Sequence, residues 1–208
     1  MSVAIIDYGV GNLRSVQKAF EHLEHEVLIT SDPAEIAAAS HVVLPGVGAF
    51  GAAADTLRAR GLEETVLEAA HSGRPFLGIC VGMQLLFDIG EEKGEHRGLG
   101  LVPGRVRRFP DALGVKIPQI GWNSLAFPKP SSIFAGIDDG ALVYFVHSYF
   151  CDPEDVTAAS ACATFTRPYA AAVSVGNIHG VQFHPEKSGT IGLKILDNFA
   201  RISGEREE

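Results

Sequence analysis

Short apolar runs alternate with helix-like segments through the first half of the chain. Four pairs, each an expected strand followed by an expected helix, occupy residues 3–8 and 13–23, 26–30 and 33–39, 41–44 and 57–70, and 76–79 and 83–89. Asp32, Pro33 and Glu35 are also the residue types that begin a helix, as N-cap, first-turn residue and capping-box carboxylate. The alternation predicts βαβ units and a parallel sheet.

The pattern changes after about residue 99. Strand-like pieces separated by Gly, Pro and Asn follow at residues 102–109, 142–149, 158–166, 170–175 and 178–183, and a helix is expected at 190–201. These short strands are expected to pair partly antiparallel. Because the sequence contains no repeat or linker, it predicts one α/β domain over residues 1–204, with residues 205–208 as a frayed tail.

The composition is that of an ordinary globular protein. The 208 residues are 46% hydrophobic and 20% charged, with a mean hydropathy of +0.15, and a chain of this length buries roughly 70% of its unfolded surface. No apolar stretch reaches the length of about 18 residues that a membrane-spanning helix needs, and an export signal is not apparent. We therefore expect no membrane insertion.

Charge and cysteine content argue against further classes of function. The formal net charge is −8, and the basic cluster of Arg105, Arg107 and Arg108 is too small to follow a phosphate backbone, so we expect no nucleic acid partner. The chain has three cysteines without C-x-x-C spacing and no histidine pair with metal-ligand spacing. These features predict neither disulfides nor a metal site, and they suit a reducing, cytoplasmic location.

Cys80 stands where an apolar strand is expected to become a helix, with Gly78 and Gly82 two residues to either side. This is the G-x-nucleophile-x-G pattern of a nucleophile elbow, in which small neighbours allow a tight, strained turn. The following helix N-terminus favours the thiolate, and the Val81 amide is placed to stabilise an oxyanion. The alternative is that Cys80 is a small buried hydrophobic residue.

His184 and Glu186 follow the last expected strand, separated by Pro185. Residues two apart in extended backbone project to the same side, so the two side chains are able to converge. His184 is then a candidate general base and Glu186 the group that orients its imidazole. Taken alone, a His-Pro-Glu turn is more often a surface feature, and only its combination with the Cys80 elbow favours catalysis.

Two glycine-containing turns follow early strands. Val47 lies between Gly46 and Gly48 after the third expected strand, so its amide is a second candidate oxyanion donor, although a plain βα turn is an equal alternative. The turn at residues 9–12 (GVGN) lacks the third glycine of a dinucleotide fingerprint, and no Walker lysine is present. We expect no nucleotide cofactor.

The segments 78–84 (GICVGMQ), 45–48 (PGVG) and 184–186 (HPE) together resemble the class I, triad-type glutamine amidotransferases. Residues 6–13 (IDYGVGNL), 118–123 (PQIGWN), 144–149 (YFVHSY) and 182–188 (QFHPEKS) narrow the resemblance to the glutaminase subunits of imidazole glycerol phosphate synthases. It extends from about residue 3 to about residue 200. It implies a flavodoxin-like, three-layer α/β fold with a central, mostly parallel sheet and antiparallel additions in the C-terminal half.

The resemblance also implies an activity and a set of site residues. L-glutamine is hydrolysed, and the ammonia passes to a (β/α)8-barrel cyclase subunit, the heterodimer partner, which makes imidazole glycerol phosphate and AICAR in histidine biosynthesis; no cofactor is implied. The matching positions are Cys80, His184 and Glu186 for the triad, Val47 and Val81 for the oxyanion hole, Gly48, Gln84, Ser148 and Tyr149 for glutamine, and Asn12, Trp122 and Lys187 for the subunit interface.

Several alternatives stay open at the level of sequence. The chain fits a glutaminase subunit of another synthase, making anthranilate or GMP, a free-standing γ-glutamyl cysteine hydrolase, or a non-catalytic binding subunit. Trp122 also fits ordinary core packing. The resemblance further suggests a glutaminase that is switched on by the ligand of the synthase subunit, and Gly46 beside Val47 allows the donor peptide to rotate with little strain.

Overall fold

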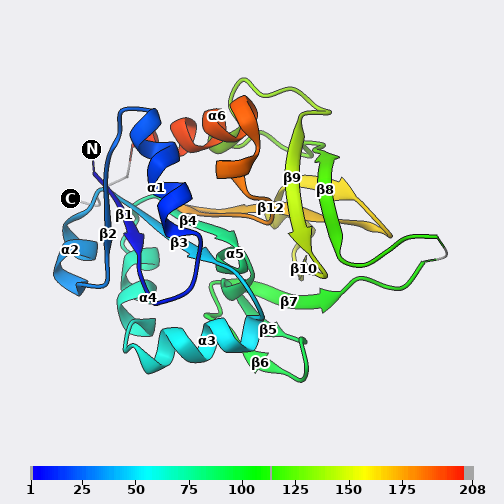
Figure 1. Cartoon of the computed structure of the whole chain (residues 1–208), viewed down its shortest axis with the longest axis horizontal. Helices are drawn as coiled ribbons and strands as arrows, with labels where there is room; N and C mark the ends of the chain where they lie inside the picture. The colour runs from blue at the N-terminus through cyan, green and yellow to red at the C-terminus, as the bar shows by residue number, and fades with distance from the viewer. Residues whose placement is uncertain (1, 113, 204–208) are drawn as a thin grey trace.

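The computed structural model describes residues 2–112 and 114–203 (Figure 1). A parallel block forms one half of the main sheet, in the order β2 (Glu26–Thr30), β1 (Ser2–Ile6), β3 (His41–Gly46), β4 (Phe76–Cys80) and β13 (Ile178–Val181). Every residue of β3, β4 and β13 is buried, as expected for parallel strands covered on both faces. The predicted parallel sheet is confirmed.

The sheet continues beyond β13 with largely antiparallel strands. Their order is β12 (Pro168–Val175), β10 (Tyr149–Pro153), β7 (Val102–Arg108), β5 (Phe87–Gly90) and β6 (His96–Arg97), and β11 (Ala159–Thr164) pairs with β12 beside this path. All of these pairs are antiparallel except β5 with β7. The expected antiparallel additions in the C-terminal half are therefore present.

A second, two-stranded sheet stands beside the main one (Figure 1). It pairs β8 (Gln119–Ser124) with β9 (Leu142–His147) in antiparallel register. The sequence pattern missed β8, and it wrongly merged residues 142–149 into one strand. The chain leaves β9 at Ser148 and enters the main sheet as β10, so these residues belong to two sheets.

Helices cover both faces of the parallel block, which gives the expected three layers. They are α1 (Leu13–His22), α2 (Pro33–Ala38), α3 (Phe50–Ala59), α4 (Glu63–His71), α5 (Val81–Leu85) and α6 (Gly189–Ala200), with 3-10 turns η1 (Ser132–Phe134), η2 (Val156–Ala158) and η3 (Pro185–Lys187). Figure 1 shows α1 beside α6 on one side of the sheet and α3 and α4 on the other. No helix within the described part of the chain is long and apolar enough to cross a membrane.

Three local expectations need correction or qualification. The single helix expected at 57–70 is two helices, because Gly61 takes a left-handed conformation (φ +69°) between them. The helix expected at 83–89 ends at Leu85, where the chain turns into β5. Asp32 caps α2 as predicted, but Glu35 contacts the Thr30 hydroxyl. The predicted frayed tail, 205–208, lies outside the described residues.

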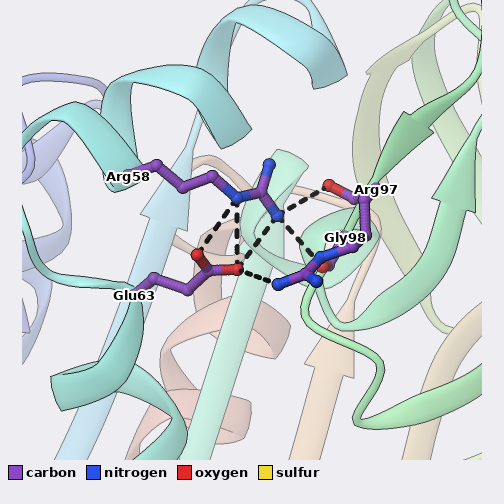
Figure 2. Close-up of polar contacts among 4 residues, drawn as sticks. All are labelled: Arg58, Glu63, Arg97 and Gly98. Atoms are coloured by element: carbon purple, nitrogen blue, oxygen red, sulfur yellow. Dashed lines mark hydrogen bonds and ion pairs between the residues drawn. The ribbon is translucent and has the colours of Figure 1, made fainter.

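An ion-pair cluster fixes the β5–β6 turn against the helices (Figure 2). Glu63 at the start of α4 pairs with Arg58 of α3 at 3.0 Å and with Arg97 of β6 at 3.2 Å. The Arg58 guanidinium also donates to the carbonyl oxygens of Arg97 and Gly98, at 3.0 and 3.2 Å. The cluster thereby fixes the end of β6 against α3 and α4.

Candidate active site

Cys80 occupies a strained turn at the carboxyl end of β4. Its backbone has φ 55° and ψ −112°, a conformation that costs free energy for any residue with a Cβ. The flanking glycines make the turn sterically feasible. A Cβ on Gly82 would lie 1.8 Å from the Leu44 carbonyl oxygen, and one on Gly78 would lie 2.7 Å from the Gly82 carbonyl oxygen. The G-x-C-x-G spacing therefore reflects close backbone approach on both sides of the sulfur.

His184 and Glu186 do converge just after β13. His184 Nδ1 lies 2.9 Å from Glu186 Oε1, and the two side chains are 7% and 1% exposed. Ser188 fixes the local backbone, since its hydroxyl donates to the His184 carbonyl at 2.7 Å and accepts from the Tyr144 amide at 3.0 Å. Because Glu186 holds Nδ1, the imidazole presents Nε2 to the neighbouring pocket.

The surroundings of His184 favour its protonated form. Burial alone would lower the pKa of His184, but hydrogen bonding to Cys80 and to Glu186, reinforced by charge attraction, outweighs burial and raises the pKa to about 9. The imidazole is thus predominantly an imidazolium at neutral pH. A cation beside the Cys80 sulfur stabilises a thiolate, which is the nucleophilic form of cysteine.

Cys80 and His184 line one pocket of about 380 Å³ at the carboxyl ends of β3 and β4. The other lining residues are Val47, Gly48, Val81, Gln84, Glu92, Pro118, Val146, His147, Ser148, Tyr149 and Lys187. The pocket thus brings together both expected oxyanion donors and all four expected glutamine-binding residues. Among the residues that the structure describes, no group of three His, Cys, Asp or Glu side chains is placed to hold a metal ion.

The three residues expected at a subunit interface have three different surroundings. Lys187 is exposed and lines the pocket edge. Trp122 is 56% exposed on β8 and packs edge-on against Tyr144, so core packing is the wrong interpretation for this tryptophan. Asn12 lies next to Glu186, with its side-chain nitrogen 3.5 Å from Glu186 Oε1. Asn12 therefore contacts the orienting carboxylate directly.

Sequence reasoning missed Gln182 as a site residue. Its side chain is fully buried, and its Nε2 lies 3.9 Å from Cys80 Sγ while its Oε1 accepts from Gln84 Nε2 at 3.1 Å. Gln182 directly follows β13 and lies two residues before His184, in a bend that the sequence pattern did not distinguish from the apolar strand. The expected extended backbone is not present at residues 184–186: Glu186 lies in the 3-10 turn η3, so His184 and Glu186 converge through that turn and not through strand periodicity.

Two other lining residues were also missed. Glu92 is the only acidic side chain among the lining residues of the pocket, and its Oε2 accepts from the Phe50 amide at the start of α3, at 2.9 Å. His147 is buried, which lowers its pKa to about 4, and its Nδ1 donates to the Tyr149 carbonyl oxygen at 2.8 Å. His147 is therefore a neutral imidazole beside the charged His184.

Comparison with known proteins identifies a matching family and close relatives. The family model for class-I glutamine amidotransferases matches residues 4–202. The chain is 51% identical to the imidazole glycerol phosphate synthase subunit HisH of Syntrophotalea carbinolica (95% of this chain, 98% of the relative), and 50% identical to that of Desulfitobacterium hafniense (98% and 95%).

A solved structure shares the fold at much lower sequence identity. PurLQS from Thermotoga maritima matches with a TM-score of 0.75 at 19% identity, over 96% of this chain and 97% of the matched one. The likeness of fold, the family match over residues 4–202 and the high identity to curated relatives agree with one another. The chain belongs to the class-I glutamine amidotransferase family.

Proposed function

We propose that this chain is the glutaminase subunit of an imidazole glycerol phosphate synthase, acting through Cys80, His184 and Glu186. The observation that carries the proposal is the strained Cys80 sharing a pocket with His184, whose Nδ1 is held by the buried Glu186. The names of the two HisH relatives, which match nearly the whole chain, support the choice of synthase.

The reaction uses the charge arrangement around Cys80. The Cys80 thiolate attacks the side-chain amide carbon of glutamine, and the Val47 and Val81 N–H groups stabilise the oxyanion, each such donor being worth roughly 3–4 kcal/mol of barrier. The His184 imidazolium gives its proton to the leaving ammonia, which leaves a γ-glutamyl thioester on Cys80. A water molecule then attacks the thioester, His184 takes its proton, and glutamate and the thiolate are released.

Glutamine recognition needs a partner for each of its charged ends. Glu92 is the carboxylate of the pocket, and since its Oε2 is occupied by the Phe50 amide, Oε1 remains for the substrate α-ammonium group. Gly48, Gln84, Ser148 and Tyr149 line the remaining pocket. We assign them to the substrate side chain and α-carboxylate.

An exposed apolar face lies next to the pocket mouth. Its residues are Ile120 and Trp122 on β8 and Leu142 and Val146 on β9, all on the same side of the two-stranded sheet. Val146 belongs both to this face and to the pocket. A (β/α)8-barrel cyclase subunit seated here, in contact with Lys187, would cover the apolar side chains and receive ammonia without its passage through solvent.

The decisive experiment measures glutamate release by the purified chain mixed with a barrel cyclase subunit. We expect release with wild type, and none with Cys80→Ala. Continued release by Cys80→Ala would refute the proposed nucleophile. Barrel or other synthase subunits for anthranilate and GMP are the matched controls, and stimulation by one of these in place of the cyclase would redirect the assignment.

The compartment follows from the chemistry of the nucleophile. Cys80, Cys151 and Cys162 are all free thiols. A catalytic thiolate is lost on oxidation, so we assign the enzyme to the reducing cytoplasm.

A further inference from the structure

Tyr8 places a hydroxyl without a partner beneath the candidate active site. The residue follows β1, and its side chain is completely buried. Among the residues that the structure describes, its hydroxyl oxygen has no hydrogen-bond partner. Buried polar atoms are nearly always paired in folded proteins, so an unpaired hydroxyl at this position calls for an explanation.

The hydroxyl lies against the turn that carries Val47. A Cβ built on Gly46 would be 2.9 Å from the Tyr8 oxygen and 2.7 Å from the Gly82 nitrogen. Tyr8 therefore reaches the point where the end of β3 meets the Cys80 elbow. Gly46 has no side chain to separate the phenol from the backbone of residues 46 and 47.

The phenol is a hydrogen-bond donor in its protonated state. Burial raises the pKa of Tyr8, and the negative charge on Cys80 raises it further. The hydroxyl therefore keeps its proton at neutral pH, where the His184 ring is charged.

Rotation of the Gly46–Val47 peptide creates a need for such a donor. The N–H of Val47 and the C=O of Gly46 belong to one rigid peptide plane and point in opposite directions. When the N–H turns toward the pocket, the carbonyl turns away from it into the protein, where a buried carbonyl requires a partner.

Building on the proposed function, we propose that Tyr8 is a positioning residue for the oxyanion hole. Its hydroxyl donates to the Gly46 carbonyl when the Gly46–Val47 peptide presents the Val47 N–H to the substrate. The hydrogen bond thereby stabilises the reactive arrangement of the turn. Tyr8 itself does not touch the substrate, because it is not among the residues that line the pocket.

Tyr8→Phe removes only the hydroxyl, and Thr166→Val is the matched control. The Thr166 hydroxyl is also buried without a partner among the described residues, but it is not part of the pocket. Both variants are assayed in complex with the cyclase subunit and its acceptor-site ligand. The readouts are kcat, KM, inhibition by glutamate γ-semialdehyde, the rate of Cys80 alkylation by iodoacetamide, and Tm. The aldehyde forms a tetrahedral adduct with Cys80 and tests the oxyanion hole, whereas alkylation tests the nucleophile alone.

We expect Tyr8→Phe to lower kcat roughly tenfold, equivalent to about 1.4 kcal/mol, and to weaken aldehyde binding by a similar factor. KM and the alkylation rate stay within about twofold of wild type, and Thr166→Val behaves as wild type. Wild-type kcat and aldehyde affinity in Tyr8→Phe would overturn the inference, as would a loss of kcat that leaves aldehyde affinity intact. Failure of the proposed function is separate, since it appears as glutamate release by Cys80→Ala.

Discussion

The side-chain nitrogen of Gln182 lies 3.9 Å from Cys80 Sγ, inside a fully buried amide pair formed with Gln84. This contact gives the sulfur a donor that is itself buried. Gln84 Nε2 also donates to the Tyr149 carbonyl oxygen at 3.3 Å, so the pair connects the elbow to β10. The position of the sulfur thus depends on two elements that are distant in sequence.

Gln182→Met tests this donor. Methionine keeps most of the volume but removes the N–H and leaves Gln84 Nε2 with one acceptor fewer. We expect kcat to fall about tenfold or more and Cys80 alkylation by iodoacetamide to slow, because the thiolate loses a stabilising partner. The matched control is Gln119→Met, since Gln119 is buried and accepts from the Tyr169 hydroxyl rather than reaching Cys80. Equal effects of the two variants would mean that only buried amide packing matters.

Glu92→Gln tests the assignment of the substrate ammonium site. A charged hydrogen bond is worth about 1.5–3 kcal/mol, so we expect KM for glutamine to rise ten- to a hundredfold with a smaller change in kcat. Steady-state kinetics of the complex measures both. Glu95→Gln is the control, because Glu95 lies in the same turn but pairs with Arg105 on the surface. An unchanged KM in Glu92→Gln would remove Glu92 from substrate binding.

The ionisation of His184 can be observed directly. Cys80 and Glu186 together hold its pKa at about 9, so an NMR titration of the ring protons is expected to have its midpoint there. In Cys80→Ala the midpoint moves down toward 6.5, because the charged ring loses one of its two partners. His179, whose pKa burial lowers to about 4, serves as an internal control that should not move. A midpoint that is the same in wild type and Cys80→Ala would exclude the Cys80–His184 charge interaction.

Acid should destabilise the folded chain through two buried imidazoles. Burial lowers the pKa of His147 and of His179 to about 4, whereas an unfolded chain binds these protons near pH 6.5. Between these values the unfolded state carries more protons, so stability falls as pH falls from 6.5 to 4, by on the order of 3 kcal/mol for each group. Urea unfolding at several pH values measures this slope. His179→Gln should flatten it, and His71→Gln, at an exposed position, should leave it unchanged.

Local features of the fold were predictable because the signals for them are local. The apolar runs of β1, β3 and β4 identified parallel strands, and the glycines around Cys80 identified the elbow, since each depends on neighbouring residues only. The division of residues 142–149 between two sheets was not predictable, because the apolar pattern continues through Ser148. The apolar pattern reports which residues are buried, and it does not show that the partly buried strands β9 and β10 belong to different sheets.

The site residues also divide into those that local motifs predict and those that only tertiary contacts place. Cys80, His184 and the Val47 turn come from short motifs, whereas Glu92 lies in a charged, glycine-containing turn that looks like any solvated loop. Its place in the pocket depends on the α3 N-terminus, because its Oε2 accepts from the Phe50 amide. Such a position is set by tertiary contacts between segments more than twenty residues apart. No spacing rule along the chain reports it.

The exposed face of the two-stranded sheet provides a last prediction, on partner binding. Large aromatic side chains at the centre of an interface commonly contribute 2 kcal/mol or more to binding, so Trp122→Ala should weaken affinity for the cyclase subunit at least about thirtyfold. Titration calorimetry measures this affinity. The control is Val156→Ala, because Val156 is 79% exposed but lies in η2, away from β8 and β9. If both variants bind the cyclase subunit as tightly as wild type, the partner is seated elsewhere, and the exposed face of β8 and β9 is not its interface.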